Sequence, residues 1–324
     1  MENRVRKLLT ALAVTAATIG LGAPAQATLL TFPTTIFWTD FGGRHLERAN
    51  ITAPGVGTNT IVDTVPGAAS GNPDSLIFDT AGNIVYSMYN GSPGSVRSFN
   101  TSNTDTLINS GYSSQATDLA LDPSGTSVLL ADRGAGCLYR VKLNGTGNQD
   151  TKCGFSNLNG LAYDGVGSLF AVTGGTVDRL DATTGANFGT ILQTGTVSGN
   201  FDGLTWDPFN GTLFAANAGC IEEINKTTLG GIACRGSFSF VDGLESDGAG
   251  HIIVADTFAQ FISYYDIASG ASIRLISAPG LDDIAPVAGL GAPPPPPLPE
   301  PATLTLMSAA LLGLGAIRRR KKQT

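Results

Sequence analysis

The sequence predicts an all-β fold, a six-bladed β-propeller, and two observations support this prediction. A short apolar phrase recurs about every 40 residues, and each complete copy is followed by a Gly-rich turn and a run of β-forming residues. Short strands separated by turns, at a period near 40, are typical of propeller blades with four antiparallel strands. The 42 glycines of the chain supply the turn residues that such a fold needs.

The repeated phrase is expected to form the innermost strand of each blade. Five complete copies and a shortened sixth are spaced by 43, 42, 43, 40 and 40 residues. The shortened copy, residues 281–288, lacks the rest of a blade, whereas residues 36–65 lack an innermost strand. We expect these two segments to join and close the ring, because closure removes a free sheet edge. The copies begin at Asp74, Thr117, Asn159, Asp202, Asp242 and Asp282.

The N-terminal end reads as an export signal. A basic start, an apolar stretch and the small residues Ala25 and Ala27 predict a signal peptide over residues 1–27, which signal peptidase would remove. The prolines within 293–298 predict a stiff linker, so the propeller is expected within 28–292. That body holds 11 Lys and Arg against 24 Asp and Glu, a net charge of −13. So acidic a surface disfavours nucleic acid as a partner.

The last 26 residues combine Pro299-Glu300-Pro301, an apolar stretch predicted as a helix over 302–317, and a basic cluster at 318–322. The apolar stretch would span about 24 Å as a helix, and the basic cluster would keep the C-terminus in the cytoplasm. Segment 299–324 resembles the PEP-CTERM sorting signal of Gram-negative bacteria. The resemblance implies a protein briefly anchored in the inner membrane and cut near the tripeptide by an exosortase-type transpeptidase. It would then reach the cell surface or extracellular matrix. A plain C-terminal anchor is the alternative.

Four cysteines lie at equivalent places in the third and fifth repeats. In each repeat one cysteine opens the predicted third strand and the other ends the fourth. An antiparallel hairpin brings such positions together, so an exported chain is predicted to form the disulfides Cys137–Cys153 and Cys220–Cys234. A zinc site is the alternative, although the chain has no Cys-x-x-Cys spacing.

The starts of the inner strands are expected to converge at one mouth of the central channel. Carboxylate and amide oxygens gathered there would suit Ca²⁺, so the sequence predicts a calcium site. The alternative is that each of these residues caps its own turn. The predicted ligands are Asp74, Asn159, Asp202, Asp242 and Asp282.

Two families of propellers share features with this chain. Segment 36–50 resembles the YWTD repeat of the six-bladed lipoprotein-receptor propellers. The strand starts Asn159-Gly160-Leu161 and Asp202-Gly203-Leu204 resemble gluconolactonase-type and NHL-type propellers. In gluconolactonase-type enzymes such positions ligate a divalent metal, which implies a lactonase or esterase-like reaction by metal-bound water. The further Glu ligand of those enzymes, in a Gly-Glu-x-Pro segment, has no counterpart at 32–35.

The sequence favours a non-catalytic binding or scaffold module over an enzyme. Its two histidines, His45 and His251, adjoin no recognisable nucleophile motif. The expected ligand at the channel mouth is a polysaccharide or a protein; a metal-dependent lactonase and an extracellular ligand sensor are the alternatives. Aromatic residues after the second strands serve either ligand stacking or packing: Trp38, Phe41, Tyr89 and Phe258. Polar residues that end these strands resemble the aspartates of the YWTD repeat, and the resemblance implies that they tie neighbouring blades together by hydrogen bonds: Asp40, Asn90, Asp132, Thr173, Asn217 and Asp256.

Overall fold

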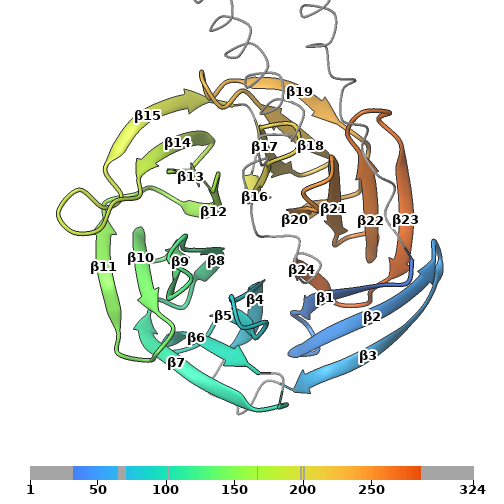
Figure 1. Cartoon of the computed structure of the whole chain (residues 1–324), viewed down its shortest axis with the longest axis horizontal. Coiled ribbons are helices and arrows are strands. Elements are labelled where there is room, and N and C mark those ends of the chain that lie inside the picture. The colour runs from blue at the N-terminus through green and yellow to red at the C-terminus, as the bar shows by residue number, and fades with distance from the viewer. Residues whose placement is uncertain are drawn as a thin grey trace, which may run out of the picture.

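The computed structural model describes residues 32–64, 71–100, 102–165, 167–197, 199 and 201–285. These residues form six four-stranded antiparallel sheets arranged as a ring around a central axis (Figure 1). The prediction of an all-β, six-bladed propeller is therefore confirmed. The predicted signal peptide (1–27), proline linker (293–298) and apolar helix (302–317) lie outside the described residues. Within the part of the chain that is described, no helix is long and apolar enough to cross a membrane.

Each sheet is one blade, and the order of its strands runs from the axis outward. Blades 1 to 3 are β24 (Leu281–Ala285), β1 (Thr34–Asp40), β2 (His45–Ala53), β3 (Val56–Thr64); β4 (Asn72–Phe78), β5 (Ile84–Tyr89), β6 (Gly94–Phe99), β7 (Asp105–Tyr112); and β8 (Ala116–Leu121), β9 (Ser127–Asp132), β10 (Cys137–Lys142), β11 (Asn148–Cys153). Blades 4 to 6 are β12 (Leu158–Tyr163), β13 (Ser168–Thr173), β14 (Thr176–Asp181), β15 (Ile191–Thr196); β16 (Phe201–Asp207), β17 (Thr212–Asn217), β18 (Cys220–Ile224), β19 (Gly231–Arg235); and β20 (Val241–Ser246), β21 (His251–Asp256), β22 (Phe261–Asp266), β23 (Ser272–Ser277).

Blade 1 closes the ring with both ends of the described chain. Its innermost strand, β24, pairs antiparallel with β1, with Phe37 opposite Ala285 and Asp40 opposite Leu281. The last described strand therefore completes a sheet that the first three strands begin, as expected for the two half-blades in the sequence. This pairing gives blade 1 its fourth strand, so the ring has no incomplete blade between blades 6 and 2.

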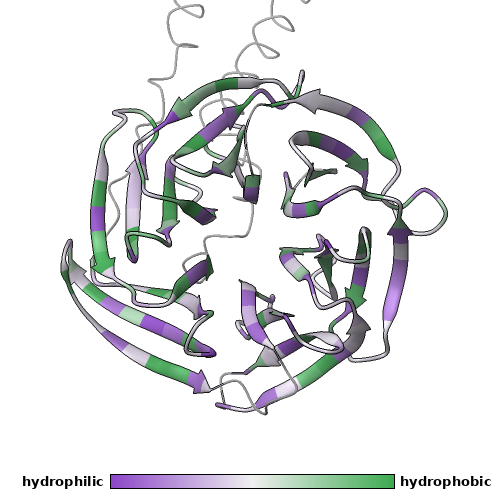
Figure 2. Cartoon of the chain, turned by 180° about the vertical axis from the view of Figure 1, so that it is seen from behind, coloured by the Kyte–Doolittle hydropathy of each residue, from purple (hydrophilic) through white to green (hydrophobic). Residues whose placement is uncertain are grey.

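The core consists of six apolar clusters, one between each pair of neighbouring blades. The second strands supply much of it, and every residue of β9 and β21 is buried, because blades cover both faces of these strands. The outermost strands carry both hydrophilic and hydrophobic residues (Figure 2), and most of their residues are exposed or half-buried. Trp38 is fully buried in the cluster between blades 6 and 1, so it packs the core and is not available for ligand stacking.

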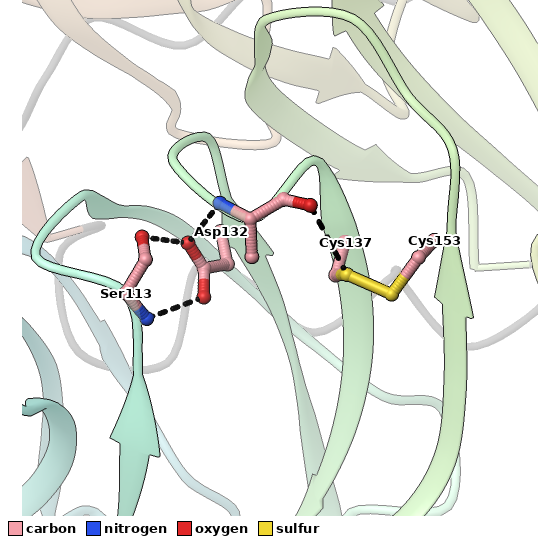
Figure 3. The surroundings of a disulfide bond; sticks show 5 residues. Ser113, Asp132, Cys137 and Cys153 are labelled. Atoms are coloured by element: carbon pink, nitrogen blue, oxygen red, sulfur yellow. Dashed lines mark hydrogen bonds between the residues drawn. A yellow bond between two sulfur atoms is a disulfide. The ribbon is translucent and has the colours of Figure 1, made fainter.

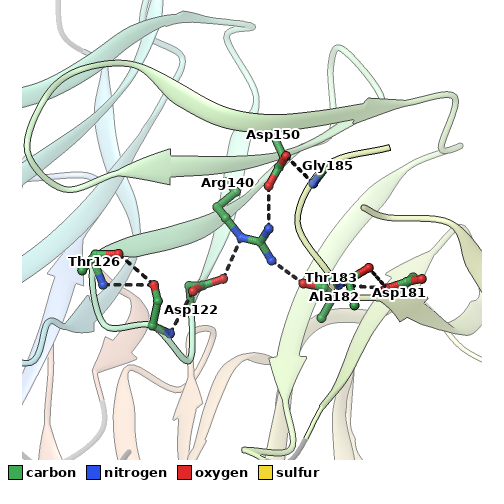
Figure 4. A network of polar contacts seen from close by, with 9 residues as sticks. Asp122, Thr126, Arg140, Asp150, Asp181, Ala182, Thr183 and Gly185 are labelled. Atoms are coloured by element: carbon green, nitrogen blue, oxygen red, sulfur yellow. Dashed lines mark hydrogen bonds and ion pairs between the residues drawn. The ribbon is translucent and has the colours of Figure 1, made fainter. Parts of the chain in front are cut away.

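A buried arginine joins blade 3 to blade 4 (Figure 4). The guanidinium of Arg140 donates to Asp122 at 2.7 Å, to Asp150 at 2.5 Å and to the carbonyl oxygen of Ala182 at 2.5 Å. Its charge is also 4.6 Å from the ring centroid of Phe188. Because the buried cation is paired on every side, we assign this cluster to stability.

Both predicted disulfides, Cys137–Cys153 and Cys220–Cys234, are present. Cys137 lies directly opposite Cys153 in the strand pairing, whereas Cys234 is opposite Glu222, so the second bridge runs diagonally across its hairpin. The predicted pairing is confirmed, and the described residues contain no free cysteine.

Two of the acids that end second strands tie the chain together as expected. Asp132 accepts hydrogen bonds from the backbone and hydroxyl of Ser113 and from the backbone of Ala135 (Figure 3). Asp256 likewise accepts from the backbone of Ser239 and Phe240. Each carboxylate thus binds two segments: the loop that arrives from the previous blade, and the turn that follows the second strand of its own blade.

Candidate functional site

The residues that begin the repeated phrase lie near the starts of the inner strands, at one axial end of the ring, and five of them form two groups. Asp74, Asp242 and Asp282, from blades 2, 6 and 1, form one group, which we call the acidic trio. The carboxyl group of Asp282 lies within hydrogen-bonding reach of both Asp74 and Asp242. Asn159 and Asp202, from blades 4 and 5, bind each other instead, with the Asn159 amide donating to Asp202 at 2.7 Å.

The acidic trio cannot carry three full charges without compensation. Burial, followed by the charge of Asp282, raises the pKa of Asp74 and of Asp242 well above the usual range. Burial also raises the pKa of Asp282, although contacts with the other two carboxyl groups oppose that shift. One oxygen of Asp282, Oδ2, is buried and has no hydrogen-bond donor. A proton held between the carboxyl groups, or a bound cation, would satisfy it.

A second tier of buried carboxyl groups lies beside the trio: Asp118, Glu245 and Asp283. Burial raises the pKa of all three, to about 7 for Asp118 and well above the usual range for Glu245 and Asp283. Asp118 is stabilised by the backbone N–H groups of Leu161 (2.5 Å) and Leu119 (2.7 Å). This tier extends the cluster of carboxyl groups beyond the trio.

The sequence reasoning missed these three residues, although a signal for two of them exists. Asp118 and Asp283 follow the first residue of the repeat, where three other copies have glycine. The reason is steric: a Cβ atom on Gly243 would lie 1.8 Å from Oδ1 of Asp283. Gly243 of blade 6 therefore makes room for the Asp283 carboxylate of blade 1. Asp118 instead lies beside Ser75 of blade 2, whose hydroxyl donates to it at 2.8 Å.

The Asn159–Asp202 half is electrostatically satisfied by comparison. Burial raises the pKa of Asp202, but the Arg133 guanidinium and the Asn159 amide both oppose the shift. The Asn159 amide also donates to the carbonyl oxygen of Phe201 at 3.1 Å. In this arrangement Asn159 directs its NH₂ group, rather than its oxygen, at Asp202.

The residue that follows each second strand is fixed above an inner-strand start. In blades 1, 3, 4 and 6 the backbone N–H of this residue donates to a backbone carbonyl oxygen. The acceptor is always the residue two positions before the start of the repeated phrase. The four bonds are Phe41 to Gly280, Arg133 to Gln115, Gly174 to Asn157, and Thr257 to Phe240. In blade 2 Tyr89 is paired with Asn72, two residues before Asp74. The side chains at this position therefore form a rim around the inner-strand starts.

The rim carries aromatic side chains over blades 1 and 2 and has Thr257 over blade 6. Phe41 and Tyr89 lie over blades 1 and 2 with ring centroids 5.8 Å apart. Phe258, one residue beyond the rim position of blade 6, stacks on Phe240 at 4.7 Å and is 76% exposed. Over blades 3 to 5 the corresponding residues are Arg133, Gly174 and Ala218.

Neither histidine is part of the candidate site. His251 opens β21 at the other axial end; its ring is fully buried, lies 2.7 Å from Asp247 and 3.5 Å from Asp266, and stacks on Tyr264. His45 opens β2, farther from the axis, and its Nδ1 atom lies 3.5 Å from the hydroxyl of Thr64. Both contacts are structural.

The predicted calcium site stays a prediction, and no three of its carboxyl groups bring one oxygen each within 4.8 Å of one another. Among the described residues, the one group of three His, Cys, Asp or Glu residues with candidate ligand atoms all within 4.8 Å is Cys220, Glu222 and Cys234. Two of its members form a disulfide, so it offers no thiolate to a metal. The ring carboxylates would have to approach one another further to ligate a single Ca²⁺, and the calcium site therefore stays a prediction.

The fold is a six-bladed propeller with a cluster of carboxyl groups at one axial end. Residues 297–321 match the PEP-CTERM protein-sorting motif, so the chain carries the sorting signal that its sequence suggested. No curated protein matches the chain.

Solved structures match the propeller in shape but not closely in sequence. A chain from a crystal structure of a nidogen/laminin complex is 16% identical, with a TM-score of 0.62; the match covers 78% of this chain and 97% of that one. A protein of unknown function from Bacteroides caccae is 12% identical, with a TM-score of 0.60, over 79% and 99% of the two chains. At these identities the likeness shows the fold alone.

Proposed function

We propose that this protein is a non-catalytic binding module that is exported, cut at its C-terminal signal and displayed at the surface or in the extracellular matrix of a Gram-negative bacterium. The observation that carries the proposal is the sorting motif at 297–321, which follows a closed propeller. The motif implies export and C-terminal processing. A transient inner-membrane anchor at 302–317 and an exopolysaccharide destination are parts of the proposal.

The geometry supports a binding role for the axial end. Its carboxyl groups crowd one another, its aromatic rim is partly exposed, and the histidines are held in structural contacts elsewhere. Such a surface offers carboxyl groups and aromatic faces to a ligand.

Fractionation of the full-length protein tests the proposal. In a host with an exosortase-type transpeptidase, the mature protein should leave the membrane fraction, and mass spectrometry should find its C-terminus near residue 301. Replacing Pro299, Glu300 and Pro301 with alanine should retain the protein in the membrane with 302–324 attached. Release of this variant at the same rate as the parent would contradict the proposed processing.

A metal-dependent lactonase is the second candidate, because Asn159 and Asp202 do lie side by side. Turnover of aldonolactones with Ca²⁺, Mn²⁺ or Zn²⁺ would support it if Asp202→Ala abolished the activity. Absence of turnover with all three metals, in a protein shown to be folded, would remove this candidate.

A further inference from the structure

We infer that the two axial ends of the propeller have different neighbours while the chain is anchored. The end at which the described chain both begins and finishes, which we call the exit end, faces the membrane, and the end that carries the candidate site faces away from it. This inference deepens the proposed function and rests on the anchor proposed at 302–317. Its basis is the direction of two paired strands and the length of chain that follows them.

Both ends of the described chain leave blade 1 at the exit end. The inner strand β24 starts at Leu281, next to the acidic trio, and ends at Ala285. Strand β1 lies beside it in blade 1 (Figure 1) and runs the other way, with Phe37 opposite Ala285. The start of β1, Thr34, therefore lies at the same axial end as Ala285. The segments that lead to the two predicted address signals thus attach to one face of the ring.

The two axial ends present different groups. The acidic trio and the 76% exposed Phe258 lie at the end of the candidate site. The exit end instead has the turns that follow the inner strands, where Asp79 accepts from the backbone of Ala81 at 2.9 Å and Asp247 from the backbone of Ala249 at 2.7 Å. A membrane at the exit end would meet turns whose aspartates already accept hydrogen bonds, and the candidate site would stay open.

The dimensions of the ring set the distance that the chain must cover for the opposite arrangement. Each blade adds three strand spacings beyond its inner strand, so the outer surface of blade 1 lies roughly 20 Å from Ala285 once side chains are included. Inner strands of five to seven residues, with a turn at each end, make the ring about 30 Å tall. Placing the candidate site against the membrane would therefore require a path of about 50 Å, outward and then along the blade.

The chain after Ala285 is short for that path. The 16 residues 286–301 separate Ala285 from the proposed anchor. A flexible chain of that length has a root-mean-square end-to-end distance of about 20–24 Å. Even a continuous polyproline II conformation would reach only about 50 Å, and the headgroup layer uses part of that length. The candidate site would meet the membrane only with a fully extended chain on one path, whereas the exit end meets it with a relaxed chain.

The N-terminal side restrains the chain in the same way before signal peptidase acts. Residues 28–33 separate the predicted signal peptide from Thr34, which is a reach of about 20 Å at full extension. That length does not carry the chain past the outer surface of blade 1 and along it. The exit end is therefore the end that both segments allow near the membrane, and a ligand approaches the candidate site from the other side.

Energy transfer from the protein to labelled lipids tests the inference. The exported protein, with its C-terminal signal intact, is purified from a host without the transpeptidase and reconstituted in vesicles of phosphatidylethanolamine and phosphatidylglycerol that contain an acceptor-labelled lipid. The donor is attached to one introduced cysteine, since all four natural cysteines are in disulfides. The two positions are Ala81→Cys, exposed at the exit end, and Phe258→Cys, exposed at the end of the candidate site.

We expect transfer from the label at Ala81→Cys to be at least about twofold higher, because about 30 Å separates the two ends. A longer tether is the matched control. Inserting about 40 Gly and Ser residues after Ala292 raises the root-mean-square reach to about 40 Å, so the difference between the two labels should nearly vanish. Thermal melting of each labelled variant checks that it is folded.

Three results would overturn the inference: equal transfer from the two labels, higher transfer from Phe258→Cys, or a difference that the longer tether leaves unchanged. Flotation of the vesicles distinguishes these results from failure of the proposed function. If the protein does not float with the vesicles, the proposed anchor at 302–317 is wrong and the inference is wrong with it. If the protein floats and the two labels transfer equally, only the orientation is wrong.

Discussion

The two sides of the axial end start from equivalent positions in a repeated fold and end in opposite electrostatic states. On the blade 3–5 side, Asp202 has the Asn159 amide at 2.7 Å and the charge of Arg133 nearby. On the blade 6–1–2 side, three aspartates face one another and one oxygen lacks any donor. Both sides share the same strand arrangement, so the neighbouring side chains decide whether a carboxyl group is paired or crowded.

The largest expected effect is on the pH dependence of stability. The folded pKa values of Asp74, Asp242, Asp283 and Glu245 lie above the unfolded values, and that of Asp118 is about 7. The folded state therefore binds more protons than the unfolded state, and the free energy of unfolding falls as pH rises from roughly 4 through these folded values. Calorimetric melting in EDTA should show a loss on the order of several kcal/mol between pH 5 and 8. If the free energy of unfolding stayed constant or rose between pH 5 and 8, the carboxyl groups would not be crowded as described.

Calcium is expected to offset that loss above neutral pH. A cation bound only by the folded state stabilises it by about 2.7 kcal/mol at a concentration one hundred times its Kd. Millimolar Ca²⁺ should raise the melting temperature at pH 8, and the double variant Asp202→Asn, Asp242→Asn should lose most of the rise. If chelation and calcium leave the parent curve unchanged, the proposed calcium site is wrong.

Replacing one member of the acidic trio should stabilise the protein at high pH. Asp282→Asn removes a carboxylate and introduces an amide that can donate to Asp74 or Asp242, so we expect a gain of about 1–2 kcal/mol at pH 8. At pH 5, where protons already join the carboxyl groups, the gain should nearly vanish. Urea unfolding at the two pH values measures the difference, and an equal effect at both would argue against shared protons.

The same change on the satisfied side should have the opposite sign and the smallest size. Asp202→Asn takes the charged acceptor away from Asn159 and the counter-charge away from Arg133, so we expect a loss of about 1 kcal/mol at pH 7. Urea unfolding beside Asp282→Asn provides the comparison. Stabilisation by Asp202→Asn would mean that the two sides do not differ.

The sequence by itself determined the architecture. The 40-residue period predicted six blades, and the half-blades at 36–65 and 281–288 predicted closure, since a propeller blade needs four strands and a ring needs no edge. The cysteines at equivalent repeat positions predicted both disulfides. Local patterns suffice for these features because each repeat is one unit of fixed length.

The tertiary structure alone decided how the predicted ring divides. Asp202 and Asp242 both begin a repeat with Asp-Gly-Leu, yet one is paired and the other crowded. The difference comes from residues in other blades, Arg133 for the first and Asp282 for the second, which lie at least 40 residues away in the chain. Pairing and burial depend on contacts across the axis, and a repeat pattern read along the chain does not contain them.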